Sequence, residues 1–173
     1  KMCRDLKIET VRKQKEYSTQ KVNLFHHWQE QEISSVIISA GSPRTINLQQ
    51  GENLFQRILN FMKAEGILKD HRKKNSENKG KTRIYQPDEE ILVKTLTAGI
   101  FLKEVKVGSY LKQGQKIGEV RDMYSGKRLE ELISSEDGLL ITLRQYPIVY
   151  EKEPVAIILT AKKSWREYFP WNR

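Results

Sequence analysis

His27 and Glu30 are the residues whose types and spacing are best suited to metal chemistry, because they form a His-x-x-Glu pair. Positions i and i+3 lie on one face of a helix, so the two side chains could hold one metal ion. A third ligand is harder to find, since His71 lies inside a long polar run. The simpler interpretation is that His27 and Glu30 are helix-surface side chains.

The positive charge of the chain is concentrated outside its regular elements. The net charge is +9, and lysine and arginine gather in residues 1–23, 69–83 and 161–173. A nucleic-acid-binding domain carries such charge on one face of a folded element, with aromatic or polar readers beside it. We therefore do not expect a dedicated nucleic-acid surface, although a charge-driven interaction remains an alternative.

Two features of the sequence restrict the class of protein to which this chain can belong. No apolar run approaches the roughly 20 residues that a membrane-spanning helix needs, so we expect no membrane segment. The single cysteine, Cys3, cannot form an internal disulfide, which favours a reducing compartment, the cytoplasm. The sequence begins in mid-pattern and is expected to be a fragment of a longer protein.

The first part of the chain has an order of predicted elements that is typical of an α/β domain. Apolar residues at helical spacing predict helices over residues 17–31 and 52–65, the second closed by Gly66. Between them, residues 34–39 (SSVIIS) have the β-branched pattern of a buried strand. Residues 1–68 are therefore predicted to be a helix–strand–helix portion of an α/β domain.

A polar connector and a β-rich segment follow. Residues 69–83 read as a basic polar linker, because residues 69–82 contain no apolar side chain. Residues 84–160 hold short β-type runs punctuated by glycines, the pattern of a small all-β barrel or sandwich. Residues 161–173 form a basic, aromatic tail. The predicted fold class is α+β.

The glycine pattern of the β segment resembles the C-terminal barrel of the succinylglutamate desuccinylase/aspartoacylase family, zinc-dependent deacylases of the carboxypeptidase-like superfamily. The residues that carry this resemblance are Ala98-Gly99-Ile100-Phe101, Val107-Gly108, Gly114-Gln115-Lys116-Ile117-Gly118, Val120-Arg121-Asp122 and Ser134-Ser135-Glu136-Asp137-Gly138. Residues 35–68 are similar to the end of the family's catalytic domain. The resemblance implies the C-terminal remnant of a carboxypeptidase-like α/β domain, followed by a barrel-sandwich domain.

The resemblance also implies an activity and site residues. The intact protein would use zinc to hydrolyse the amide bond of an N-acyl amino acid or a similar small carboxylate. Ser39 stands where the family has its general-base glutamate, and serine is not a base near neutral pH. Arg44 and Tyr150 are candidate substrate-binding residues. No zinc ligand is expected on this chain, so the chain alone should be inactive.

Two alternatives concern binding rather than catalysis. The barrel could be a non-catalytic binding module. Barrels of this shape are also related to lipoyl and biotinyl carriers, and Lys127 lies on the corresponding hairpin. The neighbours of Lys127 argue against modification, because Gly126 and Arg128 do not form the sequence context that modifying enzymes recognise. The oligomeric state and the substrate stay open.

Overall fold

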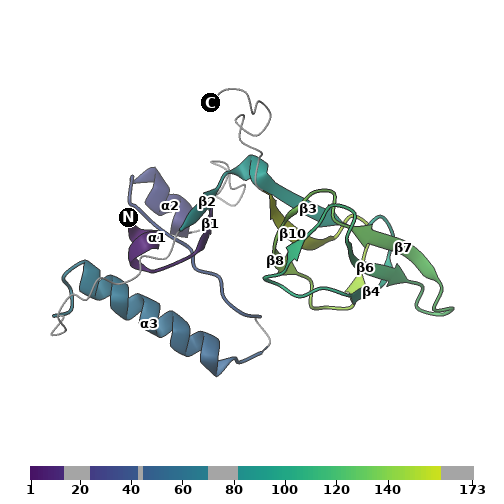
Figure 1. Ribbon diagram of the computed structural model, residues 1–173, viewed down its shortest axis with the longest axis horizontal. Helices are drawn as coiled ribbons and strands as arrows, with labels where there is room; N and C mark the ends of the chain where they lie inside the picture. The colour runs from purple at the N-terminus through teal and green to yellow at the C-terminus, as the bar shows by residue number, and fades with distance from the viewer. Residues whose placement is uncertain (14–23, 43–44, 70–81, 161–173) are drawn as a thin grey trace, which may run out of the picture. The chain divides into compact units, whose positions relative to one another are not determined.

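The chain forms two compact units, residues Lys1–Ile84 and Tyr85–Arg173, here called the helical unit and the β unit (Figure 1). The computed structural model describes residues 1–13, 24–42, 45–69 and 82–160. The predicted tail and most of the predicted linker lie outside these residues. Within the described ranges, no helix is both long and apolar enough to cross a membrane.

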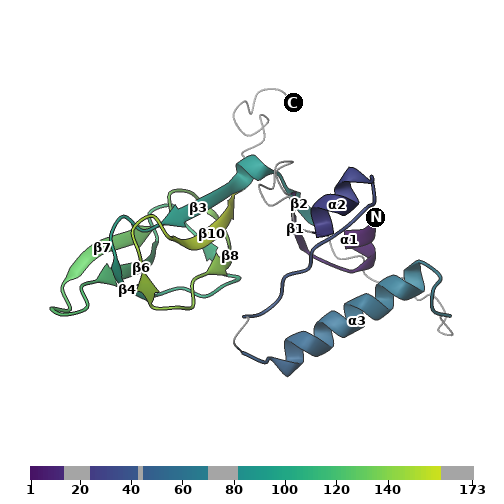
Figure 2. The ribbon, with the colours of Figure 1, turned by 180° about the vertical axis from the view of Figure 1, so that it is seen from behind.

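The helical unit contains short elements and one long helix (Figure 2). The predicted helix at 17–31 is present over its C-terminal part, and residues 17–23 lie outside the described chain. A two-stranded sheet that the sequence did not predict joins β1 to β2. The elements are α1 (Met2–Asp5), β1 (Thr10–Arg12), α2 (Leu24–Glu30), α3 (Leu48–Ala64) and β2 (Arg83–Tyr85), whose last residue opens the β unit.

Helix α3 begins earlier than predicted and ends as predicted. It starts after Asn47, whose side chain accepts a hydrogen bond from the Gln50 N–H at 3.0 Å and so caps the first turn. At the other end Gly66 has φ of +74°. The Ile67 N–H donates to the Met62 carbonyl at 2.8 Å, which closes the helix in a Schellman motif. The prediction for Gly66 is therefore confirmed.

The predicted strand at residues 34–39 is wrong, because this segment is irregular chain. Ile37 and Ile38 are 55% and 38% exposed rather than buried. A β-branched run becomes a strand only where another strand offers hydrogen-bonding partners. Among the described residues of the helical unit, only β1 and β2 pair, so no α/β layer forms there.

The β unit consists of two antiparallel four-stranded sheets. One sheet has the order β3-β10-β8-β5 and the other β7-β6-β4-β9. A 3₁₀ turn, η1 (Pro87–Glu89), precedes the first strand. The strands are β3 (Glu90–Lys94), β4 (Gly99–Lys103), β5 (Tyr110–Leu111), β6 (Lys116–Arg121), β7 (Arg128–Ile133), β8 (Gly138–Leu143), β9 (Ile148–Val149) and β10 (Pro154–Thr160).

Both sheets contribute to one hydrophobic core. The strands do not close into a barrel, since each described sheet has two edge strands. The core side chains are fully or almost fully buried: Phe101, Leu111, Ile117, Val120, Leu132, Leu140, Leu143, Val149, Val155, Ala156 and Ile158. Because these residues come from both sheets, the β unit is held together by packing between its two layers.

The β unit is an internal repeat of two four-strand halves. Exchanging β3, β4, β5 and β6 for β7, β8, β9 and β10 converts the order of one sheet into the order of the other. The match extends to residues. Thr95 and Ser134 are fully buried hydroxyls that follow β3 and β7, and Gly99 and Gly138 begin β4 and β8. Both glycines pack against backbone so closely that a Cβ atom would lie under 3.0 Å from another heavy atom.

The matching turns of the two halves have different residues at their left-handed position. In the turn between β5 and β6, Gly114 has φ of +79°, and Lys152 has φ of +63° in the matching turn between β9 and β10. A left-handed conformation costs a non-glycine residue about 1–2 kcal/mol. The lysine therefore carries backbone strain that its counterpart avoids.

We predict that Lys152→Gly stabilises the β unit by about 0.5–1 kcal/mol, since relief of the left-handed strain exceeds the extra chain entropy of glycine. Urea unfolding followed by circular dichroism measures the change. The matched control is Glu151→Gly in the same turn, where no positive φ is relieved and a loss of stability is expected. A lower midpoint for Lys152→Gly than for the wild type would contradict the prediction.

Candidate functional site

Ser39 and Arg44 are the candidates on the helical unit. Ser39 lies in the irregular segment before α3, and its side chain is exposed. Arg44 lies outside the described residues. An exposed serine hydroxyl in water keeps its ordinary weak basicity, so Ser39 does not act as a general base.

His27 and Glu30 do come together on α2. The His27 Nδ1 and Glu30 Oε2 atoms are 3.3 Å apart, and the side chains are 60% and 58% exposed. Zinc sites in proteins need three or four ligands. No group of three or more His, Cys, Asp or Glu side chains in the described part of the chain could hold a metal ion. Within the described ranges, the pair therefore lacks the third ligand that a zinc centre needs.

Tyr150 occupies the turn between β9 and β10, and its side chain is 66% exposed. Its N–H donates to the Glu153 carboxylate at 2.8 Å, and its carbonyl accepts from the Thr95 hydroxyl at 2.6 Å. Glu153 also forms an ion pair with Arg144 at 3.1 Å. The ring is thus presented to solvent from a backbone that is fixed on both sides.

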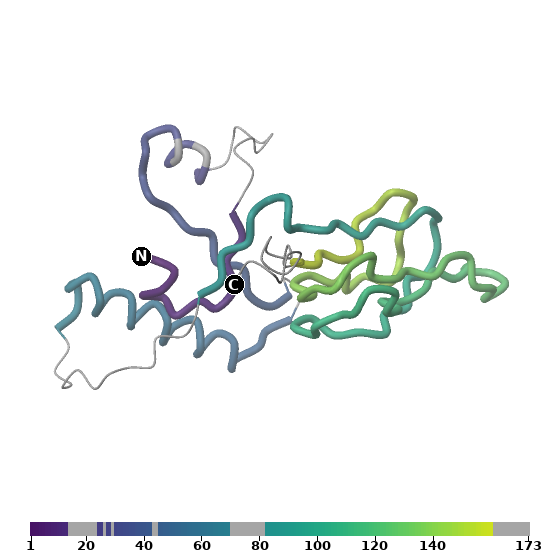
Figure 3. Tube along the Cα trace, turned by 45° about the horizontal axis from the view of Figure 1, so that its top comes forward, coloured from purple at the N-terminus to yellow at the C-terminus, as the bar shows by residue number. Residues whose placement is uncertain are grey.

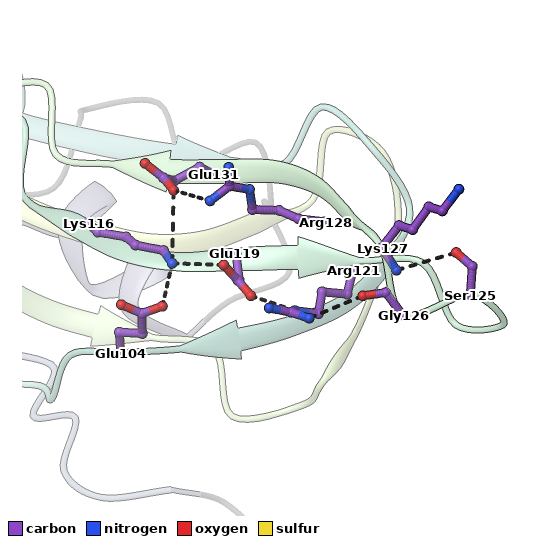
Figure 4. Close-up of polar contacts among 9 residues, drawn as sticks. All are labelled: Glu104, Lys116, Glu119, Arg121, Ser125, Gly126, Lys127, Arg128 and Glu131. Carbon is purple, nitrogen blue, oxygen red and sulfur yellow. Dashed lines mark hydrogen bonds and ion pairs between the residues drawn. The ribbon is translucent and has the colours of Figure 1, made fainter.

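The strongest charge cluster of the β unit surrounds Glu119 on β6 (Figure 4). The Glu119 side chain is only 8% exposed and contacts Lys116 Nζ at 2.8 Å and Arg121 Nε at 2.5 Å. Lys116 also contacts Glu104 at 2.6 Å and approaches Glu131 at 3.9 Å. Hydrogen bonds from Lys116 and Arg121 lower the pKa of Glu119, and those to Glu104 and Glu119 raise the pKa of Lys116. A carboxylate with a lowered pKa is a poor base, and its ion pairs favour the folded state while it is ionised.

The lowered pKa of Glu119 predicts a pH dependence of stability. A carboxyl group whose folded pKa lies below its usual 4.5 favours folding when ionised. That contribution is present above about pH 4.5 and is lost as the pH falls through the folded pKa. We expect the wild type to lose stability more steeply than Glu119→Gln does as the pH falls below about 4.5. Urea midpoints at several pH values measure this, and parallel curves would contradict it.

Lys127 lies in the turn of the β6–β7 hairpin, which extends beyond the other strands of the β unit (Figure 3). Asp122 organises this turn by accepting hydrogen bonds from the Ser125 N–H at 2.7 Å and the Tyr124 N–H at 3.1 Å. These hydrogen bonds lower the pKa of Asp122. The tip exposes Tyr124 to 93%.

Sequence reasoning missed the residues that fix the loops of the β unit. Glu130 anchors the loop after β3 by accepting from the Leu96 N–H at 2.9 Å and the Thr97 N–H at 3.2 Å. Thr95 fixes the turn that carries Tyr150. The hydroxyl-x-x-x-Gly spacing shared by Thr95–Gly99 and Ser134–Gly138 was the signal that could have found the repeat.

Comparisons with known proteins find matches among solved structures but none among family models or curated proteins. The succinylglutamate desuccinylase/aspartoacylase from Rhodobacter sphaeroides is 19% identical with a TM-score of 0.55, and the match covers 69% of this chain and 38% of that protein. This chain has part of the fold of the succinylglutamate desuccinylase/aspartoacylase proteins. The resemblance predicted from the sequence is confirmed at the level of fold.

Two further solved structures agree. The product-bound ectoine utilization protein EutE from Ruegeria pomeroyi is 16% identical with a TM-score of 0.55, over 68% of this chain and 35% of that protein. An aspartoacylase family protein from Mesorhizobium loti is 17% identical with a TM-score of 0.50, over 64% and 39%. The chain thus spans well under half the length of each of these three proteins.

Proposed function

We propose that this chain is the C-terminal portion of a deacylase-type hydrolase that acts on N-acyl amino acids or similar small carboxylates. The observation that carries the proposal is the fold match, which covers about two thirds of the chain. In this proposal the β unit is a barrel-sandwich domain, the intact protein uses zinc, and it works in the cytoplasm.

In this proposal the chain supplies substrate contacts rather than the reacting groups. Ser39 stands in place of a carboxylate base, and His27 and Glu30 have no third metal ligand among the described residues. Tyr150 can donate a hydrogen bond to a substrate carboxylate from its fixed turn. Arg44 can pair with a carboxylate through two parallel hydrogen bonds.

The test measures binding and hydrolysis by the full chain. Titration with N-succinyl-L-glutamate and N-acetyl-L-aspartate should shift the amide resonance of Tyr150, and Tyr150→Phe should weaken binding. The control is Tyr124→Phe at the hairpin tip, which should bind as the wild type does. No hydrolysis and no stoichiometric zinc are expected. One zinc ion held per chain, or binding that Tyr150→Phe leaves unchanged, would contradict the proposal.

Binding experiments on the same protein distinguish the proposal from a nucleic-acid binder and from a non-catalytic binding module. A nucleic-acid binder attracted by charge would bind RNA or DNA at about 50 mM salt and lose affinity steeply with added salt. A non-catalytic binding module would hold a defined ligand with little dependence on salt. The proposal of a deacylase portion predicts neither behaviour, only binding of the small carboxylate probes.

A further inference from the structure

The turn that carries Tyr150 is held by three hydrogen bonds at the Tyr150 backbone. The Tyr150 carbonyl accepts hydrogen bonds from the Thr95 hydroxyl at 2.6 Å and from the Glu153 N–H at 3.2 Å. The Tyr150 N–H donates to the Glu153 carboxylate at 2.8 Å. Lys152, inside the same turn, stays at φ of +63° although this conformation is strained. Residues held in strained conformations by over-determined surroundings are enriched at ligand-binding sites.

Thr95 makes the contact that is extra to the backbone pairing. Its side chain is fully buried at the end of β3. Its backbone already joins the turn, because its N–H donates to the Glu153 carbonyl at 3.0 Å and its carbonyl accepts from the Lys152 N–H at 2.8 Å. The hydroxyl adds a bond directly to the residue that bears the exposed ring.

The internal repeat supplies a built-in comparison. Ser134 occupies the matching position, is equally buried, and joins the matching turn through Gly114 and Gln115, each by a backbone hydrogen bond of 2.8 Å. Its hydroxyl, however, donates to the Glu136 carbonyl at 2.7 Å inside its own loop. The matching turn is anchored instead by Asp137, whose carboxylate accepts a hydrogen bond from the Gln113 N–H at 2.8 Å. Of the two hydroxyls, only that of Thr95 bonds to the facing turn, and it does so at the residue that bears the exposed Tyr150 ring.

We propose that Thr95 is a positioning residue that fixes the backbone of Tyr150 so that its ring is pre-organised for the carboxylate of an N-acyl amino acid. This inference rests on the proposed function, in which Tyr150 contacts the substrate. A side chain held in its bound position before binding loses less entropy when the ligand arrives. Thr95 touches no ligand itself and acts through the Tyr150 carbonyl.

The test compares Thr95→Val, Thr95→Ser and the matched control Ser134→Ala in the chain of residues 1–173. ¹⁵N relaxation reports the amide order of residues 150–153, and titration with N-succinyl-L-glutamate reports affinity. Thr95→Val should lower the order at Tyr150 and weaken binding about fivefold to tenfold, the effect of one lost hydrogen bond. Thr95→Ser, which keeps the hydroxyl, should restore both. Ser134→Ala should leave both unchanged even though it also removes a buried hydroxyl.

The outcomes distinguish the positioning role of Thr95 from the proposed function of the chain. Equal losses of affinity in Thr95→Val and Ser134→Ala would mean that both hydroxyls serve stability alone, which would overturn the inference. Wild-type order at Tyr150 in Thr95→Val would overturn it as well. If the wild type binds neither N-succinyl-L-glutamate nor N-acetyl-L-aspartate, the proposed function fails, and the order parameters still decide whether Thr95 holds the turn.

Discussion

Gly99→Ala is expected to destabilise the β unit by about 3 kcal/mol, at the upper end of the usual cost of overpacking. Gly99 begins β4, which lies between β6 and β9. An added Cβ atom would sit 2.4 Å from the Arg121 carbonyl oxygen and 2.8 Å from Val120 Cγ1. Backbone in a central strand cannot withdraw without breaking hydrogen bonds on both sides. The urea midpoint, followed by circular dichroism, measures the loss.

Gly114→Ala is the matched control for this prediction. No heavy atom that could clash lies within 4 Å of the position that its Cβ atom would occupy, so only the φ of +79° opposes the substitution. We expect a loss of about 1 kcal/mol, the cost of a left-handed residue. A loss in Gly99→Ala no larger than in Gly114→Ala would show that the strands are not as closely packed at Gly99 as described.

Leu140→Ala should cost the β unit about 3–4 kcal/mol, within the range measured for large-to-small changes in protein cores. Leu140 is fully buried on β8, and its counterpart in the repeat, Phe101 on β4, is 4% exposed. Truncation leaves a cavity between the two sheets, where neither layer can move without losing its own packing. The free energy of unfolding from urea titration measures the effect.

The control for the core prediction is Leu96→Ala in the loop after β3. The Leu96 side chain is 75% exposed, so removing it should change the stability by less than about 0.5 kcal/mol. Similar losses in the two variants would mean that Leu140 does not lie in the principal core. That result would also mean that the two sheets do not pack against each other at Leu140.

The long, strongly patterned elements were predictable from local residues. Helix α3 carries its own apolar periodicity, and Gly66 ends it through a local φ preference. The β-branched runs that became β3 and β10 were recognised in the same way. Strand β7 was missed because Glu130 and Glu131 resemble a loop, although one serves as an anchor and the other lies beside Lys116 on the sheet.

The candidate site was only partly accessible to sequence reasoning. Tyr150 was identified through a resemblance, yet the residues that fix it, Thr95 and Glu153, lie 55 and 3 positions away. Ser39 was placed at the end of a strand that does not form in the described chain. A strand and a side-chain contact both depend on a partner that the local sequence does not specify.

Residue order alone determined helices α2 and α3, five of the ten described strands and the glycine turns of this protein, because propensity and periodicity act over a few neighbouring residues. Tertiary structure decided the pairing of the strands into two sheets, the exchange symmetry of the two halves and the fixed turn at Tyr150. It also decided that residues 34–39 stay irregular. These features require hydrogen-bonding partners brought from distant parts of the chain, and folding alone brings such partners together.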